Sequence, residues 1–409
     1  MCINYIFTKK QTCMKCILTF ILLLLSNFYG LTTFPIMLLL ILMLIYCKQC
    51  ILSPPKYAKK IFYFTLFVAI SSIPAYLFRG QPILASLRAS TGYFLIFIFF
   101  LFLKLKINKQ TTEKTIIIFG TLTSTIYIIQ FILLQKGIVF LQVQENAIEL
   151  ATDARFRIAC SASIFLAYFC ALNKYLIYKN KKYLIILFIT FLPIIIQAFR
   201  AQIAALIVFT IIMIYIFWKK GLFKINKIIF ILVPSVFLLL QIPIVNEKLE
   251  YMIDKQTNST QTFANDDYVR WRTLSFFSSE YQKSPVEYIV GSGIPYQGSF
   301  KKESENLTAE GLFYQDIGLI GAAFIIGPIS IICLVCLFLT PTFIIKNSNL
   351  ENLYICIYFI FMLSISFTNA EVFRSGNFLI HAMAFYVSYL CYKEKKYYNY
   401  YARKRITTV

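Results

Sequence analysis

Arginines at the ends of apolar segments are the residues of this sequence best suited to bind an anion. Arg200 and Arg374 each lie between two long apolar runs, Arg157 directly precedes another, and Arg270 and Arg272 lie in a long polar segment. A guanidinium stays charged, and its planar fork binds phosphate through two parallel hydrogen bonds. Each arginine could instead simply reach from an apolar helix to the water interface. Charged residues that only mark the membrane surface would be mainly lysines. Several arginines at the ends of apolar helices therefore favour a phosphate-binding site.

Two of these arginines lie on a helix predicted over 265–281. Asp266, or the residue before it, is a suitable N-cap, with an acidic residue in the first turn. The aromatic residues of the stretch suit a helix that lies on a bilayer surface. Arg270 and Arg272 are about 200° apart on such a helix, so we expect them not to share one ligand. Pro285 is predicted to end the helix.

A second polar group lies where the same segment ends. Thr308 is predicted to cap the helix that follows, which places Glu310 in its first turn at the membrane surface. Tyr314 lies four residues after Glu310 and therefore shares its helix face. Between the two groups, the Gly-rich stretch 290–295 is predicted to form a tight turn.

The composition places these groups in a membrane protein. The chain has 409 residues, of which 59% are hydrophobic and only 14% are charged. The apolar residues suffice for about a dozen helices, at roughly 20 residues per membrane span. A soluble chain of this length would form two or three domains with far more charged surface. Soluble, disordered and disulfide-framework proteins are therefore excluded.

Twelve apolar runs are predicted to cross the membrane as helices, because only a helix satisfies its own backbone hydrogen bonds in lipid. The fold class is therefore all-α, a polytopic membrane protein in three parts. Residues 1–245 hold nine helices and a smaller outer loop at 135–155, residues 246–314 form one large outer loop, and residues 315–409 hold three helices and a basic tail. The runs are 16–29, 31–47, 61–78, 89–103, 115–134, 156–172, 183–199, 201–218, 228–245, 315–339, 353–369 and 377–392.

The net charge of +22 is an orientation signal. If the N-terminus is inside, the predicted inner segments hold 26 Lys and Arg and three Glu, whereas the outer segments hold 14 Lys and Arg and 15 acidic residues. The two sides then carry +23 and −1. This asymmetry follows the positive-inside rule and places both termini in the cytoplasm. Because a basic fringe facing anionic inner-leaflet lipid explains the charge, we expect a lipid bilayer and no nucleic acid as partner.

The cysteines and the single histidine have structural explanations. All 11 cysteines lie in predicted helices or inner loops. Cys13-x-x-Cys16 and Cys47-x-x-Cys50 could form a four-thiolate zinc site, but no folded domain surrounds them. We therefore expect no metal and no cofactor. His381 is predicted to make a buried hydrogen bond between helices, with a proton relay as the alternative.

Function is predicted in the membrane or at its outer face. The sequence has no P-loop and no Gly-rich dinucleotide turn, and the inner loops are too short and too basic for a nucleotide site. The outer loop 246–314 is about 70 residues long, far more than a connection needs, and such loops usually carry function. Arginines around the mouth of a helical bundle would suit a lipid-linked diphosphate.

These motifs resemble those of the O-antigen and capsule repeat-unit polymerases, which share a superfamily with the O-antigen ligases. The resemblance covers the overall plan of many spans, two outer loops and a large loop before the last three spans. Ligases typically carry a His near the exit of that loop, where this chain has Thr-Ala-Glu-Gly, and this favours a polymerase. The local resemblance rests on RWRTLSFFSSEYQKSPVEYIVGSGIPY (270–296), ENLTAEGLFYQDIGLIG (305–321) and QAFRAQIAALIVF (197–209).

The resemblance implies a glycosyl transfer without a metal at the periplasmic face of a bacterial inner membrane. The donor would be a growing glycan on undecaprenyl diphosphate, and the acceptor the terminal sugar of one lipid-linked repeat. A chain-length regulator and a flippase are possible protein partners. The arginines expected to hold the diphosphate are Arg157, Arg200, Arg374 and either Arg270 or Arg272.

An acceptor hydroxyl needs a base, and a carboxylate can supply one. Glu310 is the first candidate. Asp266 or Asp267 is the alternative, although a helix cap explains them equally simply. Trp271 and Tyr314 are candidate contacts for the glycan.

Two other functions stay open from the sequence. An O-antigen ligase, or a related lipid-linked glycan transferase, would differ only in its acceptor. A lipid-linked oligosaccharide flippase or other transporter belongs to another class, and buried charges within the spans would favour it. The sequence shows almost none, since His381 is the principal candidate, whereas the long outer loop favours an enzyme.

Overall fold

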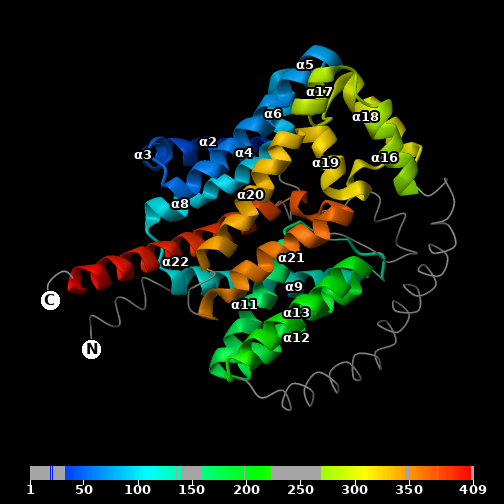
Figure 1. The fold of residues 1–409 in the computed structure, drawn as a ribbon. Helices are drawn as coiled ribbons and strands as arrows, with labels where there is room; N and C mark the ends of the chain where they lie inside the picture. Colours follow the sequence, from blue (N-terminus) through cyan, green and yellow to red (C-terminus); the bar gives the residue numbers. More distant parts are fainter. Residues whose placement is uncertain are drawn as a thin grey trace.

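The computed structural model describes residues 19, 21, 33–134, 136–139, 159–197, 199–222, 269–345, 350–374 and 376–406. This part of the chain is helical and has no strand (Figure 1), so the predicted all-α class is confirmed. The α-helices are α2 (Thr33–Tyr46), α3 (Lys48–Leu52), α4 (Lys59–Ile70), α5 (Ser72–Arg79), α6 (Ile83–Ala89), α7 (Thr91–Phe94), α8 (Ile98–Leu105), α9 (Lys109–Leu134), α11 (Ala162–Tyr178), α12 (Lys182–Ile196), α13 (Arg200–Lys219), α16 (Val269–Ser279), α17 (Pro285–Val290), α18 (Gly298–Ala309), α19 (Gly318–Ile326), α20 (Pro328–Ile345), α21 (Leu353–Asn369) and α22 (Asn377–Ile406). Short 3-10 helices are η1 (Lys56–Ala58), η2 (Leu95–Phe97), η3 (Tyr314–Ile317), η4 (Leu350–Asn352) and η5 (Glu371–Phe373).

Several of the described helices could cross a membrane. By length and composition five qualify: Lys59–Arg79, Lys109–Leu134, Arg200–Lys219, Pro328–Ile345 and Leu350–Asn369. Two helix pairs, bent by 56° and 71°, would raise the number to seven if each is one span. These apolar helices indicate a multi-pass membrane protein. Twelve spans stay a prediction, because 228–245 and all but two residues of 16–29 lie outside the described residues.

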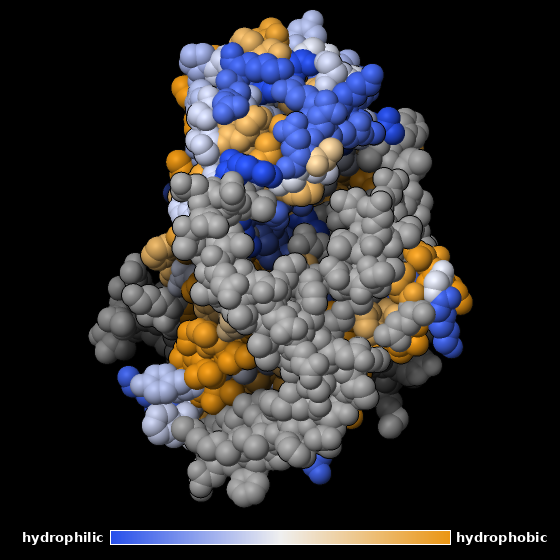
Figure 2. Space-filling view, turned by 90° about the vertical axis from the view of Figure 1, so that its right-hand side faces the viewer, coloured by the Kyte–Doolittle hydropathy of each residue, from blue (hydrophilic) through white to orange (hydrophobic). Residues whose placement is uncertain are grey.

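The surface of the peripheral helices supports the same conclusion. In the most apolar stretch of Arg200–Lys219 (α13), only 28% of the residues are buried inside the protein, whereas 67% are buried in that of Leu350–Asn369. In water, so large an apolar face would be a liability, whereas lipid covers it at no cost. Apolar surface is also visible in Figure 2. The exposed apolar side chains of α13 are Ile207, Val208, Ile211, Ile212, Tyr215 and Trp218.

The core of the bundle is built around α11, α21 and α22. Helix α11 packs against α9, α12 and α21. Phe361 of α21 lies between Phe165 and Phe169 of α11, at ring distances of 4.9 and 5.3 Å. Small residues bring α9 and α11 together, because a Cβ added to Gly120 would lie 2.3 Å from the Cβ of Ala167. Close backbone approach of this kind is typical of helices packed in a membrane.

The connections between the helices lie at two ends of the bundle, and each end has its own contacts. At one end, Lys60 donates to Thr340 (2.8 Å), and Lys174 forms an ion pair with Glu113 (2.5 Å). We call this the basic end, since the lysine-rich links lie there. At the other end, which we call the loop end, α5 meets α17 and α18. This division agrees with the predicted alternation of inner and outer loops, while the side of the membrane that each end faces stays a prediction.

The predicted span 315–339 is not one helix. It breaks at Gly327, which has a φ of +86°, into α19 and α20. The segment after α17 is attached to this break, because Gly293 N donates to Ile325 O at 2.8 Å. The backbone of Gly291 approaches closely as well, since an added Cβ would lie 2.3 Å from the nitrogen of Gly327. The hydropathy run could not reveal this contact between distant segments.

Two further boundaries were predicted wrongly. Pro285 does not end the preceding helix, which stops at Ser279. It is instead the first residue of α17, behind the N-cap Ser284, and proline suits that position because no amide donor is needed there. Glu113 was assigned to an inner loop, yet it is buried in α9, where Lys174 and Tyr354 bind its carboxylate.

Candidate functional site

A buried carboxylate joins three helix ends at the loop end of the bundle. Glu371, on η5 between α21 and α22, is fully buried. It accepts hydrogen bonds from Ser161 before α11 (2.6 Å) and from Gln202 on α13 (2.8 Å). Arg374 forms an ion pair with it at 2.8 Å. A buried charge is stable only when it is paired and hydrogen-bonded, and Glu371 meets both conditions.

The local backbone explains how Glu371 reaches this position. Ala370 has a left-handed conformation (φ +50°) and ends α21. Asn369 accepts a hydrogen bond from the amide of Glu371, and Ser366 accepts one from the amide of Val372. These side chains satisfy amides that the end of the helix leaves free, so the turn is fixed.

Asn377 ties the cluster to the first residues of α11 and α22. Its Oδ1 accepts from the backbone nitrogen of Ala162 (3.0 Å), and its Nδ2 donates to the carbonyl of Glu371 (2.8 Å). The side chain of Asn377 is fully buried. The ends of α11, α13, α21 and α22 are therefore held in one rigid polar cluster, which we call the Glu371 cluster (Ser161, Gln202, Glu371, Arg374 and Asn377).

Some hydrogen-bonding atoms in and beside the Glu371 cluster have no partner among the described residues. Arg374 uses Nη2 for its ion pair, while its Nη1 is buried and has no hydrogen-bond partner among the described residues. The Oε1 atoms of Gln197 and Gln202 are likewise buried and without a partner there. Since buried polar atoms in proteins are nearly always hydrogen-bonded, these atoms indicate a place for water or a polar ligand.

A second arginine borders the cluster. The guanidinium of Arg374 lies 6.0 Å from the ring of Phe199, the residue that precedes Arg200 at the start of α13. A helix N-terminus favours anions. One carboxylate and two guanidiniums leave this region with a net positive charge. In Figure 2, where α5, α17 and α18 lie at the top, hydrophilic surface is visible in a depression beneath them.

The loop arginines form a separate group. Arg272 Nη2 donates to the backbone carbonyl of Glu310 at 2.8 Å, which joins α16 to the end of α18. Arg270 and Trp271, also on α16, are exposed. The prediction that Thr308 begins a helix was wrong, because Thr308 lies near the end of α18 and Glu310 is its C-cap residue. Glu310 is therefore exposed at a helix C-terminus, away from the first turn where it was expected.

Tyr314 lies on the 3-10 helix η3, which packs between the elements that carry the two groups. It begins η3, so it does not share a helix face with Glu310 as predicted. The element η3 packs against α16, α19 and α21. Helix α21 leads into η5, which carries Glu371, whereas α16 carries Arg272.

A buried ion-pair network fixes α17 and α18 to α5, and sequence reasoning missed it. Arg79, at the end of α5, binds both carboxylate oxygens of Glu287 (2.9 and 2.8 Å) and one oxygen of Glu303 (2.7 Å). It also donates to the carbonyl of Tyr281. Lys283 binds Glu303 at 3.0 Å, so two positive and two negative charges balance. We assign a structural role to this network.

Arg79 was recognisable in principle, because it ends an apolar run as Arg200 and Arg374 do. Glu287 could not be found in this way, since its partner is 208 residues distant. Ser161, Gln202 and Asn377 were missed because polar residues at helix ends are common, and only the fold brings these three together. Of the other predicted residues, Arg157, Asp266 and Asp267 lie outside the described residues.

The histidine makes the predicted bond. His381 Nδ1 lies 2.7 Å from the hydroxyl of Tyr358, and both side chains are fully buried. This confirms a buried hydrogen bond between α22 and α21. Among the described residues, no group of three or more His, Cys, Asp or Glu could hold a metal ion. Cys13 and Cys16 lie outside that part of the chain.

Compared with known proteins, the chain matches no family model and no curated protein.

Proposed function

We propose that this protein is an oligosaccharide repeat-unit polymerase. It joins undecaprenyl-diphosphate-linked repeats into O-antigen or capsular polysaccharide at the periplasmic face of a bacterial inner membrane. The observation that carries the proposal is Arg374, whose side chain is 10% exposed and whose buried Nη1 has no hydrogen-bond partner among the described residues. Glu371 holds it at the end of the bundle that the charge pattern predicts to be outside. The long polar segment at the same end also supports it.

The leaving diphosphate needs positive charge that is already in position. Arg374 presents Nη1 to it, and Arg200 adds a second guanidinium at the N-terminus of α13. Charge that is fixed before the reaction stabilises the departing anion without reorganisation. Glu371 has both oxygens engaged, so it acts as a positioning residue that orients Arg374. In this mechanism the bond from the sugar to the diphosphate breaks as the acceptor hydroxyl attacks.

The acceptor hydroxyl loses its proton to a carboxylate, for which we propose Glu310. Its exposure leaves the carboxylate accessible to a substrate at the loop end. Arg272 fixes the backbone of Glu310, and Trp271 on the same helix offers an exposed aromatic face to a sugar. The diphosphate arginines that belong to this proposal are Arg374 and Arg200. Arg270 and Arg272 belong to the acceptor side.

Deletion of the gene tests the proposed reaction. A cell that lacks the polymerase should still attach glycan to its final acceptor, but with one repeat unit, because flipping and attachment continue. The measurement is the length distribution of surface glycan by gel electrophoresis and mass spectrometry. Complete loss of attached glycan would point instead to a ligase or a flippase, and unchanged long chains would contradict all three functions.

Replacement of the proposed base tests Glu310 alone. Glu310→Gln keeps the shape of an exposed side chain, so we expect normal expression together with a loss of chain extension of about 100-fold, a typical contribution of general base catalysis. The rate of repeat addition should be measured with purified lipid-linked repeats at several pH values. Glu305→Gln, an exposed glutamate of α18, is the matched control. Full activity of Glu310→Gln would remove Glu310 as the base.

A further inference from the structure

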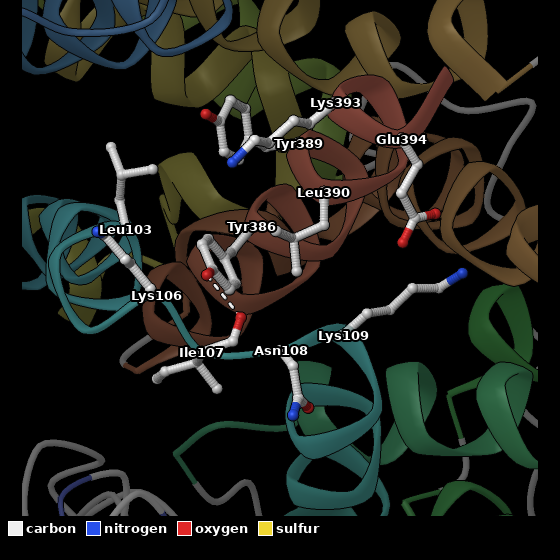
Figure 3. A pocket seen from close by; sticks show the side chains of 10 residues that line it. All are labelled: Leu103, Lys106, Ile107, Asn108, Lys109, Tyr386, Tyr389, Leu390, Lys393 and Glu394. Atoms are coloured by element: carbon white, nitrogen blue, oxygen red, sulfur yellow. Dashed lines mark hydrogen bonds between the residues drawn. The ribbon is translucent and has the colours of Figure 1, made fainter. Parts of the chain in front are cut away.

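A cavity at the basic end has walls and charges that the proposed reaction does not use. It lies between the end of α8, the link to α9 and the outer part of α22, and it measures about 500 Å³ (Figure 3). Its position is where the apolar part of α22 gives way to the basic tail. In a membrane protein this is the level of the lipid head groups. The lining residues are Leu103, Lys106, Ile107, Asn108, Lys109, Tyr386, Tyr389, Leu390, Lys393 and Glu394.

The walls of the cavity are apolar and fixed. Leu103, Ile107 and Leu390 line it together with two tyrosine rings. The hydroxyl of Tyr386 donates to the carbonyl of Ile107 at 2.7 Å, which ties α22 to the link between α8 and α9. Figure 3 shows this bond beside the cavity. A preformed apolar wall next to the bilayer suits an acyl chain or a glycerol backbone.

The rim of the cavity is cationic. The lining contains three lysines, Lys106, Lys109 and Lys393, and one carboxylate, that of Glu394, so it carries a net charge of +2. None of the three lysines forms an ion pair with a described residue. Lysine ammonium groups on flexible stems bind phosphate as point charges, and basic pockets between membrane helices hold anionic head groups.

We propose that this cavity binds the phosphate head group of one anionic phospholipid. The lysine-rich rim attracts the phosphate, while the apolar wall receives the first part of the acyl chains. A soluble phosphate ester shares the head-group chemistry but has nothing to place against Leu103, Ile107 and Leu390. The proposal depends on the membrane character of the chain and is independent of the proposed polymerase function.

Native mass spectrometry of the full-length protein in detergent tests this site. Phosphatidylglycerol is titrated, and the occupancy of the tightest-binding lipid gives its dissociation constant. Replacing Lys106, Lys109 and Lys393 together by Gln should weaken binding at least tenfold, because each basic residue near a membrane surface contributes about a fivefold factor toward anionic lipid. The matched control replaces by Gln three lysines that are exposed at the same end but lie outside the cavity: Lys181, Lys219 and Lys220. An equal loss in both triple variants would overturn the proposal in favour of a diffuse basic fringe.

Three further measurements separate the remaining explanations. Glu394→Gln removes the only negative charge of the lining and should strengthen binding severalfold, and an unchanged dissociation constant would contradict a phosphate at this position. Leu390→Trp narrows the cavity but keeps its charges, and it should weaken the tight site. Retained tight binding in that variant would overturn the cavity as the site. Glycerol 1-phosphate that binds as tightly as phosphatidylglycerol would show a soluble ligand in place of a lipid.

Discussion

Arg374→Ala is expected to reduce the addition of repeat units about 100-fold or more. The substitution removes the guanidinium whose buried Nη1 has no partner among the described residues, and it leaves the buried Glu371 without its ion pair. Loss of one preorganised donor that stabilises developing negative charge typically costs a factor of about 100 to 1,000. The measurement is the rate of chain extension with purified donor and acceptor, together with the chain length of surface glycan in cells.

Two variants separate binding of the diphosphate from support of the fold. Glu371→Gln keeps the shape of the side chain but has one acceptor oxygen in place of two, so it no longer accepts from both Ser161 and Gln202 and no longer carries the charge that holds Arg374. We expect slower extension at near-normal expression. Arg374→Lys keeps the charge and should restore part of the activity. Arg88→Ala, an arginine at the loop end that stacks on Tyr296, is the control. Long-chain polymer from Arg374→Ala at the control's level would disprove the assignment.

Arg79→Met is expected to lower the free energy of unfolding by about 3 to 5 kcal/mol. The substitution leaves the carboxylate of Glu287 buried without its partner, and breaking one side of a buried ion pair typically costs that much. The side chains of Arg79 and Glu287 are both fully buried, so solvent does not screen the loss. Because the network anchors α17 and α18 to α5, these two helices should detach from the bundle first. Thermal unfolding in detergent and proteolysis between residues 280 and 310 measure the two effects.

The double variant Arg79→Met/Glu287→Leu identifies the cause of the instability. Removing both charges should recover part of the loss, because an uncharged pair of similar volume no longer carries an unpaired buried ion. Lys301→Ala breaks only the exposed pair with Glu305 and should cost less than about 1 kcal/mol. If Arg79→Met is no less stable than Lys301→Ala, the network does not anchor α17 and α18 to α5.

The loop end shows why sequence-based reasoning succeeded with some functional candidates and failed with others. Arg200 and Arg374 were found because charge is rare in this chain and an arginine at the end of an apolar run is conspicuous. Their partners were not conspicuous. Ser161, Gln202 and Glu371 are separated by up to 210 residues, and only the packing of α11 and α13 against α21 brings them within hydrogen-bonding distance.

The wrong predictions arose where hydropathy or a single capping residue was read without the neighbouring sequence and the fold. Residues 315–339 read as one apolar run, but the run contains Gly327 and Pro328, at which α19 ends and α20 begins. Gly293 N donates to Ile325 O at this break. Thr308 reads as a helix cap, although it lies near the end of α18. Hydropathy and capping patterns describe the energy of a residue in its own segment, and neither includes such partners.

The sequence by itself determined that the chain is helical and rich in membrane-compatible segments, because apolar content and periodicity act locally and lipid permits little else. It also supplied the charge asymmetry, in which +23 and −1 fall on the two predicted sides. The tertiary structure decided which polar side chains meet. The ion pair of Arg374 with Glu371, the network of Arg79 and the cavity at the basic end all depend on contacts between helices that are distant in sequence. Such contacts form because a buried charge or hydrogen-bonding group must find a partner inside the fold, and the fold alone determines which partner is within reach.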